Sequence, residues 1–298
     1  MLDEEQVRQF REEGYLIVPG CASTWEVVAL NSELDGWIDE SRQHSENWGV
    51  TADGKHVFDL EPGHSAERPK LRRVTNPADF SDLYRSVLFD GRVVDVAAGL
   101  LGPDVKFHHC KINIKMPSME TYVGWHQDHP FEPHTNDSVV VALVMLDDMT
   151  EQNGALQVVP GSHRTHYSHY KDERFAGEID RALWPEFEAG SVKLTGKAGD
   201  VVFIDSWMVH GSPANRSDTP RRLLICDYTA ADAFPLSPSN ILSAYRGHLV
   251  RGRPTRMARL RAGAVELPPL YKESSFFAVQ GQDGAQMSGL AESTGAMM

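Results

Sequence analysis

The chain has 298 residues, of which 41% are hydrophobic, so it can bury a full core as one large β domain with helical cover. Lys and Arg total 29 against 42 Asp and Glu, and the net charge of −13 argues against a protein that binds nucleic-acid phosphates or anionic membrane surfaces. A small-molecule substrate, bound by a monomer or a homodimer, is the expected partner.

Cysteine usage and the first residues predict a cytosolic protein. Cys21, Cys110 and Cys226 are odd in number, far apart and mostly within apolar runs, which is typical of reduced, buried thiols. The N-terminal residues lack a basic segment followed by a long apolar one, and no apolar run elsewhere approaches the length of a membrane span. The expected compartment is therefore the cytosol.

The front of the chain, residues 1–104, is predicted to be largely helical. Residues 3–13 read as a short amphipathic helix with Asp3 as its N-cap, and the segment 15–18 follows as a strand. A second capping box at 23–26 begins a longer helix, whose apolar residues recur at helical spacing. Two further helices are expected over residues 79–88 and 92–101.

A long loop over residues 43–70 interrupts these helices. It is rich in His, Gly, Pro and charge, with a short strand expected near 56–58. Long ordered loops in enzymes are often lids, but insertions of no functional consequence are nearly as common. Arg72 and Arg73 follow the loop. One of them could bind an anionic group of the substrate, and the alternative is a pair with a surface carboxylate.

From Val105 the hydrophobic period changes to two, which predicts a strand-rich core over residues 105–230. Short strands after a helical front half predict two packed sheets of the jelly-roll type. Residues 164–190, with aromatic side chains in a polar background, are expected to form a helical insertion over the mouth of the barrel. The expected strands cover residues 105–116, 122–125, 138–146, 156–159, 191–194, 201–204 and 222–229.

The remainder divides into a C-terminal cover, residues 231–279, and a tail, residues 280–298. Several arginines around Tyr245 are interpreted as a solvated helix face within 240–275, with a docking surface as the alternative. The tail is of low complexity and should matter little to catalysis. Residues 1–279 are thus expected to form a single domain.

The stretch around His126 carries a candidate metal site. Residues i and i+2 of a strand point to the same face, so the His126 imidazole and the Asp128 carboxylate should converge in front of the sheet. His210, where another apolar strand ends in a turn, supplies a third ligand. Two imidazoles and one carboxylate form the facial triad of non-haem Fe(II) oxygenases, which leaves three positions for substrate and O₂. By itself, His-x-Asp is a weak signal, because a solvated polar strand end has the same pattern.

An arginine that follows the third ligand strengthens this interpretation. Arg221 stands at the start of an apolar strand, where a guanidinium is costly to bury without a partner and its planar fork suits a carboxylate. A buried anion is therefore expected beside Arg221. The adjacent Arg222 should point the opposite way.

At these residues the sequence resembles the phytanoyl-CoA dioxygenase family of Fe(II)- and 2-oxoglutarate-dependent oxygenases. The family pattern is His-x-Asp, a distal His-Gly-Ser and an Arg eleven residues beyond that His, and the resemblance runs from about Glu4 to Tyr228. It implies an α+β fold with a mainly β core, a double-stranded β-helix of the jelly-roll or cupin-like type with the N-terminal helices packed on one sheet. Three further motifs carry the resemblance: Glu12-Glu-Gly-Tyr-Leu-Ile-Val18, Asn153-Gly-Ala-Leu-Gln-Val-Val-Pro-Gly-Ser-His163 and Gly199-Asp-Val-Val-Phe203.

The resemblance also implies roles for individual residues. 2-Oxoglutarate is expected to chelate the metal through its 2-oxo acid end, while its far carboxylate reaches Arg221 and Ser212. On the strand before the first ligands, His109, Lys111 and Asn113 alternate inward, and one or more of them should line the co-substrate site unless a bulge shifts the phase. An aromatic substrate pocket suits a small or mid-sized organic molecule. Its candidate residues are His129, Phe131, His134, Trp207 and Phe234, with Arg72 or Arg73 as an anion partner.

The expected activity is hydroxylation of an unactivated C–H bond, with succinate and CO₂ as co-products. Asp128 occupies the place where related halogenases carry a small residue, so chlorination is not expected. Desaturation or ring closure stays open, because the pose of the substrate decides between these outcomes. A zinc hydrolase also uses two His and one carboxylate, but it needs no buried arginine. A non-catalytic jelly-roll binding protein would explain the fold and not the triad.

Overall fold

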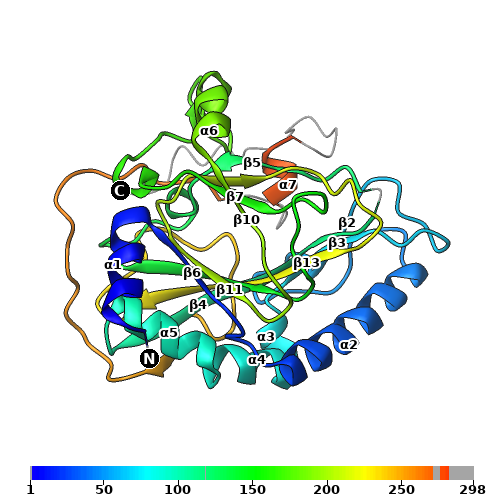
Figure 1. Cartoon of the computed structure of the whole chain (residues 1–298), viewed down its shortest axis with the longest axis horizontal. Helices are drawn as coiled ribbons and strands as arrows, with labels where there is room; N and C mark the ends of the chain where they lie inside the picture. Colours follow the sequence, from blue (N-terminus) through cyan, green and yellow to red (C-terminus); the bar gives the residue numbers. More distant parts are fainter. Residues whose placement is uncertain (1, 118, 271–275, 282–298) are drawn as a thin grey trace.

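The structure, a computed structural model, describes residues 2–117, 119–270 and 276–281 and has three layers (Figure 1). A large sheet forms the middle layer, helices from the front of the chain cover one of its faces, and a four-stranded sheet lies on the other. This is the predicted jelly-roll architecture. The helices of the front are α1 (Glu4–Glu13), α2 (Thr24–Glu40), α3 (Pro77–Phe80), α4 (Asp82–Phe89) and α5 (Arg92–Leu101).

Both sheets are antiparallel at every strand pair of the described residues. In spatial order the large sheet contains β1 (Tyr15–Val18), β11 (Val201–Asp205), β6 (Val139–Met145), β13 (Arg221–Ala230), β4 (Val105–Lys115), β3 (Leu71–Thr75) and β2 (Phe58–Leu60), with β14 (Leu249–Arg251) also paired to β4. The small sheet contains β10 (Val192–Leu194), β7 (Leu156–Val158), β12 (His210–Ser212) and β5 (Val123–His126).

The predicted helix caps are confirmed at the front of the chain. The Asp3 carboxylate accepts a hydrogen bond from the backbone N–H of Gln6 at 2.8 Å, and the Gln6 side chain accepts one from the backbone of Asp3 at 3.0 Å. Helix α1 ends at Gly14, whose φ of 80° is a left-handed conformation that glycine adopts without a steric cost. These local signals fix where the chain turns from α1 into β1.

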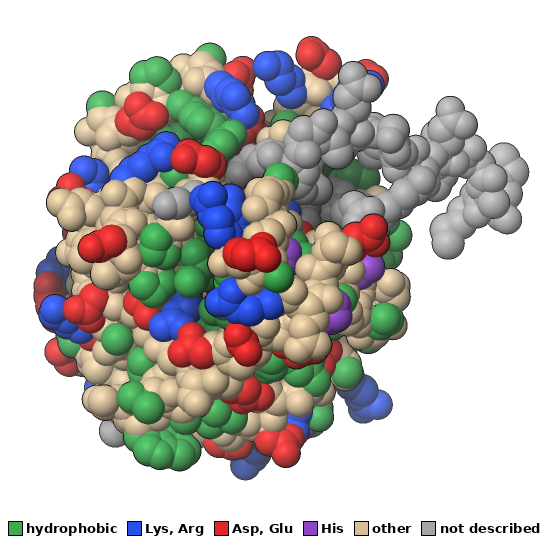
Figure 2. Space-filling model, turned by 90° about the vertical axis from the view of Figure 1, so that its right-hand side faces the viewer, with side chains coloured by type: hydrophobic (Ala, Val, Ile, Leu, Met, Phe, Trp, Pro, Cys, Tyr) green, Lys and Arg blue, Asp and Glu red, His purple; other side chains and the backbone are tan. Residues whose placement is uncertain are grey.

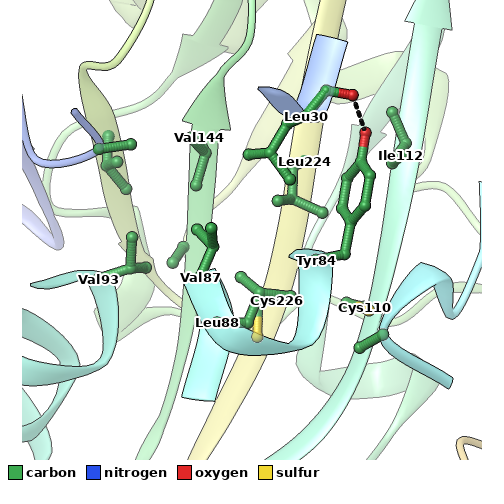
Figure 3. Close-up of a cluster of buried hydrophobic side chains, with 14 of the residues drawn as sticks. Leu30, Tyr84, Val87, Leu88, Val93, Cys110, Ile112, Val144, Leu224 and Cys226 are labelled. Carbon is green, nitrogen blue, oxygen red and sulfur yellow. Dashed lines mark hydrogen bonds between the residues drawn. The ribbon is translucent and has the colours of Figure 1, made fainter. Parts of the chain in front are cut away.

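Successive side chains along the strands of the large sheet point to opposite faces, so the sheet has a separate hydrophobic core on each face. On β13, Leu224 and Cys226 face the helices, whereas Leu223 and Ile225 face the small sheet. Figure 3 shows the helix-side core, in which the fully buried Tyr84 of α4 lies among side chains of α2, β4 and β13. Its hydroxyl donates a hydrogen bond of 2.8 Å to the carbonyl of Leu30, so the ring is buried without an unsatisfied polar group. The opposite face of the sheet is left for the functional site.

Two helix predictions need correction. The helix expected over residues 79–88 is divided into α3 and α4, because Ser81 is extended and caps α4 by accepting a hydrogen bond from the N–H of Tyr84. The insertion at 164–190 begins as a hairpin of β8 (Tyr170–Lys171) and β9 (Arg174–Phe175), followed by the short helix α6 (Trp184–Gly190). The two central hairpin residues, Asp172 and Glu173, both have positive φ, as tight hairpin turns require.

The helix face expected around Tyr245 is also absent from the described residues 240–270. That segment is irregular chain with the single strand β14, and four of its arginines, Arg246, Arg251, Arg259 and Arg261, pair with separate carboxylates. Arg251 lies 2.7 Å from Asp95, and Arg259 lies 3.0 Å from Asp232. Of the predicted tail, Gln280 is buried against the core and belongs to the cover, next to α7 (Phe276–Val279), whereas residues 282–298 lie outside the described part.

Strand β3 was not predicted, because its sequence Leu71-Arg-Arg-Val-Thr75 places two arginines in a buried segment. All five residues are buried. Arg72 forms a buried ion pair with Asp59 of β2, with Nε and Nη2 donating to the two carboxylate oxygens at 2.8 and 3.1 Å. The expected surface partner of Arg72 is therefore an internal one, and Arg73 points to the opposite face of the strand.

Replacing Asp59 with alanine should destabilise the fold strongly. The substitution leaves the Arg72 guanidinium, 2% exposed, without its carboxylate, and breaking a buried pair in this way costs about 3–5 kcal/mol. Urea unfolding measures the change in the free energy of unfolding. Asp39→Ala, which removes the partner of Arg42 in an exposed pair, is the matched control and should leave that free energy almost unchanged. Equal effects of the two substitutions would contradict the role given to Asp59.

Acidic and basic side chains are interspersed on the face drawn in Figure 2 and form no continuous basic surface there. The negative net charge therefore does not hide a basic patch on this side of the molecule. Among the described residues, no helix combines the length and the apolar character that crossing a membrane would demand.

Candidate metal centre and co-substrate pocket

Three side chains meet between the two sheets at the ends of strands β5 and β12. These strands pair in register at His126 and His210, which brings the two imidazole centroids to 4.1 Å. The Asp128 carboxylate completes the group, with one oxygen 3.6 Å from Nε2 of His126 and the other 3.6 Å from Nε2 of His210. All three candidate ligand atoms lie within 4.8 Å of one another. The structure thus brings together the triad that the sequence predicts.

The path by which Asp128 reaches this point differs from the prediction. Strand β5 ends at His126, and Asp128 has helical dihedral angles (φ −76°, ψ −34°) at the start of a 3₁₀ turn. The turn is fixed by the fully buried Gln127, whose N–H donates to Nε2 of His169 at 2.9 Å and whose side-chain amide donates to the carbonyls of Thr165 and Trp207. A turn held by Gln127, and not strand alternation, therefore aims the Asp128 carboxylate.

Strand β12 also differs from the expectation for the third ligand. His210 does not end the apolar strand β11; it begins a short strand of the opposite sheet. The chain crosses from one sheet to the other between Asp205 and His210. This crossover explains how the third ligand comes to face the first two.

Both imidazoles are oriented by backbone carbonyls. Nδ1 of His126 donates to the carbonyl of Gly124 at 2.8 Å, and Nδ1 of His210 donates to that of Met208 at 3.0 Å. Each ring therefore turns its Nε2 toward the Asp128 carboxylate, as metal-binding histidines typically turn theirs toward the other ligands. Burial lowers the pKa of His210 to about 4. Burial alone would raise the pKa of Asp128, but the neighbouring His210 and His126 outweigh this effect and hold that pKa below its usual range.

This donor set fits a divalent metal ion. At neutral pH the group offers two neutral imidazoles and an ionised carboxylate, which are the protonation states that metal binding requires. Two donors about 2.1 Å from a common ion lie roughly 3.0–3.4 Å apart, close to the 3.6 Å observed for each carboxylate–imidazole pair. The triad alone suits both Fe(II) and zinc, so the neighbouring residues must distinguish the two.

A buried cation lies on the same wall as the triad. Arg221, the first residue of β13, is 2% exposed; its Nε and Nη2 donate to the carbonyl of Gly154, and Nη2 also donates to Oγ of Ser212 at 3.1 Å. No carboxylate of the described residues forms an ion pair with it. Burial lowers the pKa of Arg221 to about 10, so the guanidinium stays charged at neutral pH. Arg221 and Ser212 are therefore in direct contact at the place where the sequence predicts a buried anion.

Lys115 is a part of this site that the sequence analysis missed. It is 1% exposed and lies opposite Arg221 in the register of β4 and β13. Its Nζ donates to Oγ of Ser212 at 2.7 Å and to the backbone carbonyls of Ser212 and Pro213. Lys115 shares the strand phase of Lys111 and Asn113, so the same alternation could have identified it. Two basic side chains thus converge on one serine hydroxyl, and burial lowers the pKa of Lys115 well below its usual value.

Arg222 faces the other side of the sheet, as predicted. Its guanidinium donates to Asp147 at 2.7 and 2.8 Å and to Asp35 at 2.6 Å. These bonds satisfy its charge far from the triad. Of the two adjacent arginines, only Arg221 is available to the metal pocket.

A cavity connects the triad with these cations. In addition to His126, Asp128, His210, Ser212 and Arg221, it is lined by Arg73, Lys111, Asn113 and apolar residues of β5, β6, β7 and β13. The predicted inward phase of β4 is therefore confirmed for Lys111 and Asn113. His109 is not among the lining residues and lies with Nε2 3.5 Å from the carboxylate of Asp227. A bulge opposite Asp227 and Tyr228 disturbs the register at this point, as the sequence analysis allowed.

Most of the predicted substrate residues lie elsewhere. Phe131 packs edge-to-face on His126, with centroids 5.8 Å apart. Trp207 is held by a hydrogen bond from its indole to Asp137 and stacks on His129, and neither lines the cavity. His134 and Phe234 face a separate surface cavity at β4 and the C-terminal cover.

Two buried carboxyl groups near the site were also missed. Burial raises the pKa of Asp227 to about 8 and that of Glu132 to about 7. Asp227 lies against His109, and Glu132 lies 3.7 Å from Nε2 of His108. Neither residue belongs to a motif. The alternation of β13 places Asp227 on the face of the metal cavity, but no sequence pattern indicates the position of Glu132. Both groups are therefore largely neutral or only partly charged near pH 7.

Comparisons with known proteins agree with this geometry. A family model described as phytanoyl-CoA dioxygenase (PhyH) matches residues 10–223. A probable alpha-ketoglutarate-dependent hypophosphite dioxygenase of Stutzerimonas stutzeri is 33% identical over 89% of this chain and 90% of its own length. EctD from S. alaskensis, solved with 2-oxoglutarate and 5-hydroxyectoine, is 26% identical with a TM-score of 0.66 and covers 91% of this chain and 89% of its own. The carbocyclase SnoK from nogalamycin biosynthesis is 25% identical with a TM-score of 0.62, over 82% and 94% of the two chains.

Proposed function

The chain belongs to the phytanoyl-CoA dioxygenase family and is a 2-oxoglutarate-dependent dioxygenase, and from this premise we propose that it hydroxylates an unactivated C–H bond of a small molecule. The observation that carries the proposal is the combination of the His126–Asp128–His210 triad with a buried, carboxylate-free Arg221 in one cavity. The first group suits a metal with open positions, and the second suits a dicarboxylate co-substrate.

Each polar group of the pocket receives a role in this proposal. His126, Asp128 and His210 hold Fe(II), which together with O₂ and 2-oxoglutarate supplies the oxidant. Arg221 and Ser212, which line the cavity, bind the far carboxylate of 2-oxoglutarate, and Lys115 donates a hydrogen bond to the same Ser212 hydroxyl and positions it. Asn113 lines the same cavity as that corner and the triad, and we assign it to the nearer end of the co-substrate.

A zinc hydrolase would use the same triad but leave Arg221 unexplained. Its guanidinium would be a buried charge without an anionic partner, which is unfavourable by several kcal/mol. Desaturation or ring closure is the alternative within the same cofactor chemistry, and the similarity to a carbocyclase supports keeping it. One relative is named for hypophosphite and one similar structure was solved with 5-hydroxyectoine, and these names support a small substrate.

We also propose a cytosolic enzyme that acts as a monomer or a homodimer and binds no nucleic acid. Cys21, Cys110 and Cys226 are free and buried, which suits a reducing compartment. The net charge of −13 and the interspersed charges of Figure 2 support the absence of a nucleic-acid surface.

Turnover under ¹⁸O₂ in chloride-containing buffer tests the reaction type. With Fe(II), 2-oxoglutarate and a panel of small candidate substrates, succinate release identifies a substrate, and mass spectrometry examines its product. We expect a product that gains one labelled oxygen. An unlabelled, dehydrogenated product would favour desaturation, and a chlorinated product would contradict the role of Asp128 as a metal ligand.

A further inference from the structure

A second cation site lies in the metal cavity, apart from the Arg221 corner. Arg73 of β3 is 1% exposed and lines the cavity, and its Nε and Nη2 are buried without a hydrogen-bond partner. The nearby Asp59 is already bonded through both oxygens to Arg72. A buried guanidinium without an anion is unfavourable, so its persistence here calls for a ligand.

Lys111 extends this second site. Arg73 is in register with Asn113 of β4, and Lys111 lies two residues along that strand. Lys111 is therefore the diagonal neighbour of Arg73, at a distance of about 7–8 Å that long side chains can span. Lys111 also lines the cavity, and no described residue forms a hydrogen bond or an ion pair with it. Asp227, the carboxyl group on the same face, lies against His109 and pairs with neither cation. Arg73 and Lys111 therefore present two charges to the same space, and neither forms a direct ion pair with a carboxylate of the described residues.

The second site is too far from Arg221 to be part of the same anion pocket. In the register of the large sheet, Arg73 of β3 pairs with Asn113 of β4, and Asn113 pairs in turn with Leu223 of β13. Leu223 lies two residues beyond Arg221 on β13. Two strand spacings and two residues along a strand separate the backbones of Arg73 and Arg221 by about 12 Å. Each arginine thus serves a different negative group.

The charges of the residues that line the cavity also favour a bound anion. Three cations, Arg73, Lys111 and Arg221, line it together with a single carboxylate, Asp128. A divalent metal and a doubly charged 2-oxoglutarate cancel each other when both are bound. The loaded pocket would then keep an excess of two positive charges, in a protein whose net charge is −13. A local excess of this kind favours a bound anion of one or two charges.

We infer that the substrate carries a small oxoanion group, a carboxylate or a tetrahedral phosphorus acid, which Arg73 and Lys111 bind beside the metal. The inference rests on the proposed function, because it places the anion next to the metal and the co-substrate.

Anaerobic calorimetry with the Fe(II)- and 2-oxoglutarate-loaded protein tests this inference. Hypophosphite, methylphosphonate and acetate are the probes, and wild type is compared with Arg73→Gln, Lys111→Gln and the control Arg222→Gln, whose guanidinium lies on the other face of the sheet. We expect at least one probe to bind wild type and the control equally, and Arg73→Gln and Lys111→Gln to weaken its binding at least tenfold. The Kd of 2-oxoglutarate should change less than about threefold in both cavity variants.

The outcomes separate this inference from the proposed function. A wild-type protein that forms no complex with Fe(II) and 2-oxoglutarate would contradict the proposed function itself. A protein that forms this complex normally but binds none of the probes, or binds them equally well in the cavity variants, would overturn only the oxoanion site. Weaker 2-oxoglutarate binding by Arg73→Gln with unchanged probe binding would also overturn it, since Arg73 would then serve the co-substrate. Tighter binding of the phosphorus acids than of acetate would identify the group as tetrahedral, and the reverse order would identify it as a carboxylate.

Discussion

Replacing Asp128 with alanine is expected to abolish turnover and to weaken iron binding while the fold stays intact. Asp128 supplies the only carboxylate among the described residues that line the cavity, and both imidazoles face it at 3.6 Å. Loss of a residue that merely supports a ligand costs about 10–100-fold in metal affinity or activity, so loss of the ligand itself should exceed that range. Activity assays and iron quantification after desalting measure both effects.

The same loss is expected for His126→Ala and His210→Ala. Asp148→Ala is the matched control, because Asp148 is an exposed carboxylate that pairs with Lys197 away from the cavity. Thermal unfolding should show that all these variants remain folded, since neighbouring strands supply the stability of the site. Near wild-type turnover with stoichiometric iron in any one of the three ligand variants would show that the triad is assigned incorrectly.

Replacing Arg221 with alanine should raise the Kd of 2-oxoglutarate by a large factor. Removal of one partner of a buried charge pair costs about 3–5 kcal/mol, which corresponds to a roughly hundred- to thousandfold change. Lys115 retains its bonds to Ser212 and keeps some of the anion site in place. Titration of the Fe(II)-loaded protein with 2-oxoglutarate under anaerobic conditions measures the change.

Arg222→Ala provides the control for Arg221→Ala. Arg222 is adjacent in sequence but pairs with Asp147 and Asp35 on the other face of the sheet. Its removal should leave the Kd of 2-oxoglutarate unchanged and affect stability alone. The reverse ranking of the two variants would move the co-substrate anchor to Arg222 and shift the strand phase of β13 by one residue.

The sequence predicted those features that depend on local signals. The capping boxes at Asp3 and Ser23 and the alternation of β13 all appear in the structure. These signals depend on the spacing of a few nearby residues, so they can be recognised without knowledge of the tertiary fold. The same applies to the opposite orientations of Arg221 and Arg222.

Features that depend on long-range packing were not predictable in the same way. Strand β3 was missed because its arginines look like surface residues until Asp59 is placed beside Arg72. Asp128 was expected on a strand, although a turn held by Gln127 positions it. The pocket aromatics were assigned by proximity in sequence to the triad, and Trp207 shows why this fails: one hydrogen bond to Asp137 turns the ring away.

The central claim is that the triad and Arg221 together bind Fe(II) and 2-oxoglutarate in one cavity. Anaerobic addition of 2-oxoglutarate to the Fe(II)-loaded protein tests it most directly, because a chelate of the two gives a weak visible absorption band. We expect this band in the wild-type protein at stoichiometric 2-oxoglutarate, its loss in Asp128→Ala and a much higher titration midpoint in Arg221→Ala. A wild-type protein that binds the metal at the triad but develops no band at any 2-oxoglutarate concentration would contradict the account.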